Sequence, residues 1–99
     1  MLNIDTRKDG DALTIALTGR LDTITAPELE KAVKDNVSGI SSLTMDFEKL
    51  EYISSAGLRV LLSAQKTMNR QGKMVVTHVN DTVQEIFEVT GFADILTIE

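Results

Sequence analysis

The sequence predicts a single α/β domain in which helices pack on a mixed β-sheet of four to five strands. Three features of the 99-residue chain support this fold class. Two runs of alternating apolar residues flank Asp9-Gly10, a turn signal typical of a β-hairpin. A second strand-like run ends at Ile53 and passes directly into a helical pattern. The short run 74–77 is apolar on both faces, which indicates an interior strand with both faces covered.

Length and composition narrow the possible functions. Apolar residues make up 42% of the chain, enough for one core, so we expect one domain over residues 1–99. The formal net charge of −5 disfavours nucleic acid as a partner. The absence of cysteine excludes disulfides and agrees with a reducing cytosol. No apolar run approaches the roughly 18 residues of a membrane helix, so we expect a soluble, unprocessed cytoplasmic protein without direct membrane insertion.

The first two strands are read from alternation. Leu2 and Ile4 alternate with polar residues before the turn, and Leu13, Ile15 and Leu17 do so after it. Period-two alternation places these side chains on one face of each strand. The chain is therefore expected to open with a β-hairpin.

A helix is expected from about Ala26 to Val37. Thr25 precedes it as a cap, Pro27 suits the first turn, and Glu28 completes a capping box. The residues at helical spacing that should be buried are Ala26, Leu29, Val33 and Val37.

The central strand and the second helix follow. Leu43, Met45 and Phe47 alternate with polar residues, which predicts a half-buried strand. In the helix after Ile53, one arc should face the core and contains Leu58, Leu61, Ala64 and Met68. The opposite arc forms a basic stripe of Ser55, Arg59, Ser63, Lys66 and Arg70.

The C-terminal third contains two more predicted elements after the strand at 74–77. A short amphipathic helix is expected from about Thr82 to Val89, ended by Gly91. The apolar residues at 95–98 suggest a final edge strand or tail.

Two serines lie where the central strand becomes the second helix, and two interpretations of them remain open. Ser54 or Ser55 can be an ordinary helix cap, because a hydroxyl oxygen accepts from unpaired N–H groups of the first turn. Alternatively, the helix N-terminus favours an anion, so a phosphate on Ser55 would be tolerated there and Arg59, one turn on, could meet it. Gly57 costs about 1 kcal/mol of helix propensity relative to alanine, which suggests that another group approaches closely.

Catalysis is not expected. A nucleophilic serine needs a base within hydrogen-bonding reach, and the only histidine is His78, expected at a strand end with its ring hydrogen-bonded. The sequence has no G-x-S-x-G elbow, no P-loop and no G-x-G-x-x-G motif. We therefore predict a protein that is not an enzyme, with no catalytic residues, no metal site and no cofactor of its own.

Two segments resemble a known family. The run from Ser54 to Leu62, SSAGLRVLL, is similar to the signature of the STAS domain, found in sulphate transporters and anti-sigma factor antagonists, where an Asp-Ser-Ser/Ala-Gly-Leu segment opens the second helix. The run from Leu17 to Asp22, LTGRLD, resembles the family's Leu-x-Gly-x-Leu/Ile-Asp segment. The order of the predicted elements also matches. The resemblance implies a single STAS domain.

The resemblance also implies a site. Ser55 aligns with the serine that is phosphorylated in anti-sigma factor antagonists, and Asp22 and Thr23 align with residues that flank it. Ser54 stands where the family usually has aspartate, which makes Ser54 the second choice of acceptor. The implied recognition surface consists of Asp22, Thr23, Ser54, Ser55, Gly57 and Arg59.

On this resemblance the protein is an anti-sigma factor antagonist in bacterial signalling. Its unphosphorylated form would bind an anti-sigma factor that is also a serine kinase and so release the sigma factor. Phosphorylation at Ser55 would inactivate it, and a serine phosphatase would reset it. The alternative is a cytosolic STAS subunit that docks on a membrane lipid-transport ATPase complex. A nucleotide-binding module is a third possibility, without a phosphate loop to support it.

Overall fold

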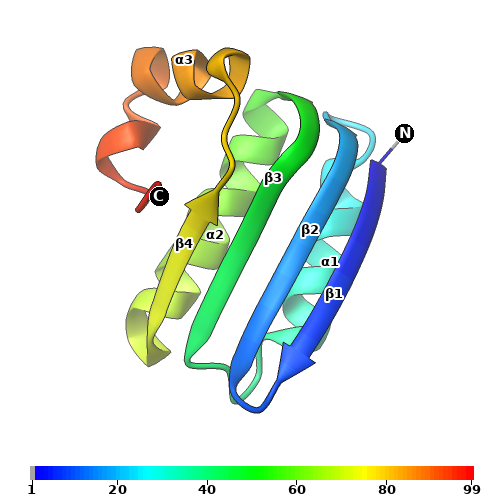
Figure 1. Cartoon of the computed structure of the whole chain (residues 1–99), viewed down its shortest axis with the longest axis vertical. Coiled ribbons are helices and arrows are strands. Elements are labelled where there is room, and N and C mark those ends of the chain that lie inside the picture. The colour runs from blue at the N-terminus through cyan, green and yellow to red at the C-terminus, as the bar shows by residue number, and fades with distance from the viewer. Residues whose placement is uncertain (1) are drawn as a thin grey trace.

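Four strands form one mixed sheet in the computed structural model, which describes residues 2–99 (Figure 1). In chain order the elements are β1 (Leu2–Asp9), β2 (Ala12–Leu21), α1 (Ala26–Asn36), β3 (Ser42–Ile53), α2 (Ser55–Gln71), β4 (Lys73–Thr77), α3 (Asp81–Thr90) and the 3₁₀ helix η1 (Phe92–Asp94). The strand order is β1-β2-β3-β4, antiparallel between β1 and β2 and parallel elsewhere. The predicted fold class and the N-terminal hairpin are confirmed.

Helices α1 and α2 cover the same face of the sheet, behind the strands in Figure 1. Right-handed crossovers β2-α1-β3 and β3-α2-β4 that step in one direction across a sheet put both helices on one side. The other face carries half-buried side chains, such as Thr14, Ala16 and Val75, and exposed ones, such as Thr18. The prediction that both faces are covered is therefore wrong, because an apolar residue such as Val75 is tolerated half-exposed on the open face.

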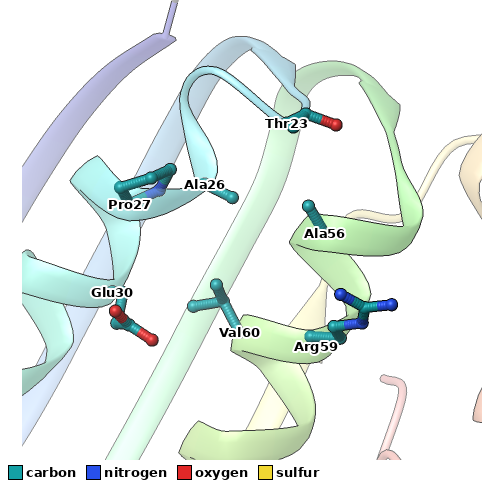
Figure 2. A pocket seen from close by; sticks show the side chains of 7 residues that line it. All are labelled: Thr23, Ala26, Pro27, Glu30, Ala56, Arg59 and Val60. Atoms are coloured by element: carbon teal, nitrogen blue, oxygen red, sulfur yellow. The ribbon is translucent and has the colours of Figure 1, made fainter.

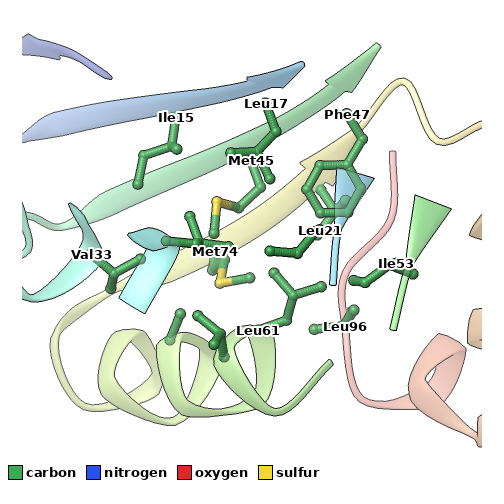
Figure 3. Packing of buried hydrophobic residues seen from close by; sticks show 14 of the residues in the cluster. Ile15, Leu17, Leu21, Val33, Met45, Phe47, Ile53, Leu61, Met74 and Leu96 are labelled. Carbon is green, nitrogen blue, oxygen red and sulfur yellow. The ribbon is translucent and has the colours of Figure 1, made fainter. Parts of the chain in front are cut away.

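The core lies between the sheet and the helices (Figure 3). The four residues predicted for the inner arc of α2 are all buried, and Leu61 and Met68 are completely so. On α1, Ala26, Leu29 and Val33 are buried as expected. Val37 is only half-buried, since the helix ends at Asn36 and Val37 is its C-cap.

Helix α3 closes the end of the core beyond β3. Its cap residue Asn80 donates from Nδ2 to the carbonyl oxygen of Leu50 at 2.7 Å. Phe87 packs on Phe47 with ring centroids 6.3 Å apart, and both rings are fully buried. The C-terminal residues then return to β4, where Ile98 forms a single parallel bridge with Val76 rather than a full fifth strand.

Two register shifts in β3 bring its carboxyl end level with that of β2. Relative to β2, β3 has extra residues between Asp46 and Lys49 and again between Leu50 and Tyr52. Such bulges lengthen and bend one strand against its neighbour. Leu21 and Ile53 consequently lie opposite each other, so the segments that follow β2 and β3 begin side by side.

Candidate functional site

The candidate site lies at the carboxyl ends of β2 and β3, where the loop 22–25 leads to α1 and the serine pair leads to α2. The backbone N–H of Ser54 donates to the carbonyl oxygen of Leu21 at 2.8 Å. This hydrogen bond joins the two connections, which are more than thirty residues apart in the chain. The N-terminus of α2 is thereby held against the loop before α1.

Gly57 allows α2 to start this close to the strands. A Cβ atom at Gly57 would lie 2.7 Å from Leu21 Cγ and 2.9 Å from Ile53 Cγ1. Both distances are shorter than a carbon-carbon contact of about 3.5–4.0 Å. The close approach that the glycine suggested is therefore made by the protein's own strand ends. Gly57 is buried, so it shapes the site from beneath and does not form part of its exposed surface.

The two serines have different structural roles. Ser54 is the N-cap of α2, with extended backbone, and its hydroxyl oxygen accepts from the N–H of Gly57 at 3.4 Å. Ser55 is the first residue of the helix and is exposed. The cap interpretation is confirmed for Ser54, and Ser55 presents its side chain to solvent.

Asp22 organises the loop before α1. Its Oδ1 atom accepts from the backbone N–H groups of Ile24 and Thr25, each at 3.0 Å. These hydrogen bonds stabilise the carboxylate, and that of the Thr25 N–H is the largest cause of a pKa of Asp22 below its ordinary value. Asp22 therefore holds the loop in shape.

Thr25 does not cap α1 with its side chain, contrary to the prediction. Its hydroxyl accepts from the N–H of Asp22 at 2.9 Å and lies 2.9 Å from the carbonyl oxygen of Arg20. The side chain is 4% exposed. Because the hydroxyl is engaged by the end of β2, it ties the strand to the helix start instead of meeting the free N–H groups of α1.

The loop displays Thr23 and Ile24 to solvent. Thr23 is exposed and Ile24 is 83% exposed, the most exposed large apolar side chain of residues 2–99. Sequence reasoning missed Ile24. The available signal was one large apolar residue within the polar turn between Asp22 and Thr25.

A groove of about 220 Å³ separates the first turns of α1 and α2. It is lined by Thr23, Ala26, Pro27, Glu30, Ala56, Arg59 and Val60 (Figure 2). In Figure 2, Ala26 of α1 and Val60 of α2 point toward each other across it. Glu30 on one wall and Arg59 on the other carry opposite charges, and Arg59 is exposed one helical turn beyond Ser55.

His78 is engaged elsewhere. At the end of β4 its Nδ1 atom lies 3.0 Å from Asp46 Oδ1, and its backbone has a positive φ of 57°. Among residues 2–99, no group of three or more histidine, cysteine, aspartate or glutamate side chains is arranged to hold a metal ion. None of the helices in this range is long and apolar enough to cross a membrane.

The structure thus brings all six predicted site residues to one end of the molecule, with Gly57 buried beneath the site. Ser55, Arg59 and Thr23 are exposed there, whereas Asp22 and Ser54 are half-buried and use their side chains in internal hydrogen bonds. At this end of the molecule an exposed serine stands at the start of α2, beside the loop that Asp22 holds in shape.

Comparison with known proteins identifies the family. The family model described as STAS domain matches residues 3–99, and the chain belongs to this family. It is 32% identical over 98 residues to the anti-sigma-B factor antagonist of Listeria monocytogenes, covering 93% of this chain and 82% of that protein. It is 28% identical over 99 residues to the anti-sigma-B factor antagonist of Staphylococcus aureus, covering 98% of this chain and 92% of that protein.

A solved structure has the same fold. An anti-sigma factor antagonist from Mycobacterium paratuberculosis superposes with a TM-score of 0.89 at 19% identity, over 99% of this chain and 85% of that one. At this level of identity the likeness concerns the fold alone.

Proposed function

We propose that this protein is an anti-sigma factor antagonist, a binding module switched by one phosphate. Its unphosphorylated form binds an anti-sigma factor with serine-kinase activity and releases the sigma factor, and phosphorylation of Ser55 ends the binding. Membership of the STAS family and the similarity to anti-sigma-B factor antagonists support the first half. The observation that carries the second half is the exposed position of Ser55 at the start of α2, with Ser54 serving as the cap.

The helix start accommodates a phosphate without refolding. In the first turn, the N–H of Ser54 is taken by Leu21 and that of Gly57 by the Ser54 hydroxyl, which leaves the N–H groups of Ser55 and Ala56 available. These groups and the positive end of the helix dipole favour an anion. Arg59, four residues on, adds a cation on the same side of the helix. Phosphorylation would therefore change the surface rather than the fold.

The partner surface follows from which residues are exposed. Ser55, Arg59, Thr23 and Ile24 would contact the anti-sigma factor, with Ile24 as an apolar anchor beside the groove. Asp22, Ser54 and Gly57 would act by holding the loop and the helix start in position. A phosphate adds about −1.5 to −2 charges at the centre of this surface. A loss of about 3 kcal/mol from burying that anion would weaken binding on the order of a hundredfold.

The remaining roles follow from this mechanism. The protein is a substrate of the kinase and of a serine phosphatase, is not itself an enzyme, and needs no cofactor, since ATP belongs to the kinase. Sigma factors act in the cytoplasm, so the proposal places the protein there, with neither nucleic acid nor membrane as direct partner. The relatives named as antagonists favour this role over docking on a lipid-transport ATPase.

The test uses each anti-sigma factor kinase of the source organism, purified singly. The wild type, Ser54→Ala and Ser55→Ala variants are incubated with ATP and the kinase, and intact mass and peptide mapping locate the phosphate. We expect modification of the wild type and Ser54→Ala but not of Ser55→Ala. Calorimetry should show that phosphorylated wild type binds on the order of a hundredfold more weakly. The proposal fails if no kinase both binds and modifies the protein, or if the phosphate remains in Ser55→Ala.

A further inference from the structure

The outer edge of β1 is unpaired. β1 bonds to β2 on one side, and nothing in residues 2–99 pairs with its other side, where it forms the border of the sheet in Figure 1. The opposite border differs, because Ile98 bridges to β4. An open strand edge presents unpaired N–H and C=O groups that can hydrogen-bond another strand.

The side chains of β1 divide between the two faces of the sheet. Leu2 is buried and Ile4 half-buried, so they lie on the face covered by helices. Asp5 and Arg7 lie on the open face, where they line a groove with Ala16. Arg7 Nε is 3.7 Å from Asp5 Oδ2, and the side chains are 83% and 66% exposed. The edge thus carries one cation and one anion on the same face, two residues apart.

We propose that β1 is a self-association strand to which the β1 strand of a second copy adds antiparallel, about a twofold axis through Thr6. The two sheets then continue into each other. The inference is independent of the proposed function, since Thr6 lies opposite Ile15 in the middle of β2, away from the loop that follows this strand.

Face continuity restricts the possible registers. A twofold axis perpendicular to the joined sheet keeps the helix-covered face of one copy next to that of the other. Directly opposed residues must then come from the same face, because side chains alternate along a strand. The axis must therefore pass through a residue rather than between two residues.

Charge selects one register among these. An axis through Asp5, Arg7 or Lys8 would place that residue opposite its own copy, and like charges directly opposed are destabilising. An axis through Ile4 would pair no charges and shorten the overlap. An axis through Thr6 places Asp5 of each copy opposite Arg7 of the other, giving two attractive pairs and no like pair.

The charges also explain selectivity. Charged side chains on an edge strand usually discourage pairing with other chains. Here they disfavour foreign strands and shifted registers yet match a second copy, so the same residues repel and attract according to the partner. All the pairs are exposed, so the dimer should be weak, concentration-dependent and sensitive to salt.

Charge variants test the register by sedimentation velocity from micromolar to millimolar concentration. Asp5→Arg and Arg7→Asp each place like charges opposite one another, and each should raise the dimer dissociation constant by about tenfold or more. Mixing the two variants should restore dimers, because one chain then carries two cations and the other two anions. Arg70→Asp is the matched control, with the charge change of Arg7→Asp but at an exposed position of α2, and should associate like the wild type.

A cysteine pair gives an independent readout, since the natural chain has no cysteine. The axis places the two Thr6 residues opposite each other, with Cβ atoms about 4.5–5.5 Å apart. The two Lys8 residues would be four positions apart along the strands, about 13 Å. Under mild oxidation Thr6→Cys should form a disulfide-linked dimer much faster than Lys8→Cys. A wild type that stays monomeric at millimolar concentration, mixed charge variants that do not associate, or equal crosslinking at both positions would each overturn the proposal.

Discussion

Replacing Gly57 by alanine has two opposite effects of similar size on the free energy of unfolding. The structure indicates which of them is larger. Alanine should gain about 1 kcal/mol of helix propensity over glycine. Its Cβ, however, would lie 2.7 Å from Leu21 Cγ and 2.9 Å from Ile53 Cγ1. Leu21 and Ile53 are 0% and 1% exposed, so neither can move into solvent. Overpacking of a closed core costs about 1–3 kcal/mol.

The net expectation is that Gly57→Ala destabilises the protein by about 1 kcal/mol, because the steric cost exceeds the gain in propensity. In a domain of this size, that change lowers the melting temperature by about 4–8 °C. Thermal unfolding followed by circular dichroism, with urea unfolding to obtain the free energy, measures it.

Leu21→Ala supplies the matched background. It removes the nearest obstructing atoms, so Gly57→Ala should be much less destabilising there, or even stabilising through its helix propensity. The reasoning would be refuted by a Gly57→Ala protein that melts higher than the wild type, or by an equal cost in both backgrounds.

Three further changes follow from the same structure. Leu61→Ala should lower the free energy of unfolding by about 2–5 kcal/mol in urea titrations, because Leu61 is completely buried, and a change below about 1 kcal/mol would contradict its place in the core. Ser54→Asp should raise the melting temperature by a few degrees, since aspartate keeps the capping acceptor and adds a negative charge at the positive end of the helix dipole; an unchanged value would count against the cap. Asp22→Ala should destabilise the protein near neutral pH. Because folding lowers the pKa of Asp22 from 3.8, the stabilisation is present above that value and disappears as pH falls through the lower folded pKa, so the gap between wild type and variant in urea titrations should narrow in acid, and a constant gap would refute the role of the charge.

The elements themselves follow from local pattern. The Asp9-Gly10 turn signal between alternating runs predicts the hairpin, and Asp9 and Ala12 are indeed its last paired residues. The 3.6-residue spacing that places Leu58 and Leu61 on one arc of α2 predicts their burial correctly. Such features depend on neighbours within a few residues, so sequence reasoning can reach them.

The errors concern distant contacts. Threonine is a common N-cap residue, but the hydroxyl of Thr25 is hydrogen-bonded to the carbonyl oxygen of Arg20 and to the N–H of Asp22. Val75 suggested a strand covered on both faces, but the direction of the crossovers leaves one face of the sheet open. Thr25 thus found partners that the fold brought in, whereas Val75 was left without the covering layer that its strand pattern suggested.

By itself, the sequence determined the order and type of the elements, the serine pair at a helix start and the resemblance to the STAS family. Only the tertiary structure decided what each site residue does. Ser54 became the cap and Ser55 the exposed serine because the Ser54 N–H meets Leu21 and Gly57 packs on the same strand ends. The exposure of Ile24 likewise depends on the turn that Asp22 closes. These outcomes depend on close packing between segments far apart in the chain, which periodicity and propensity do not encode.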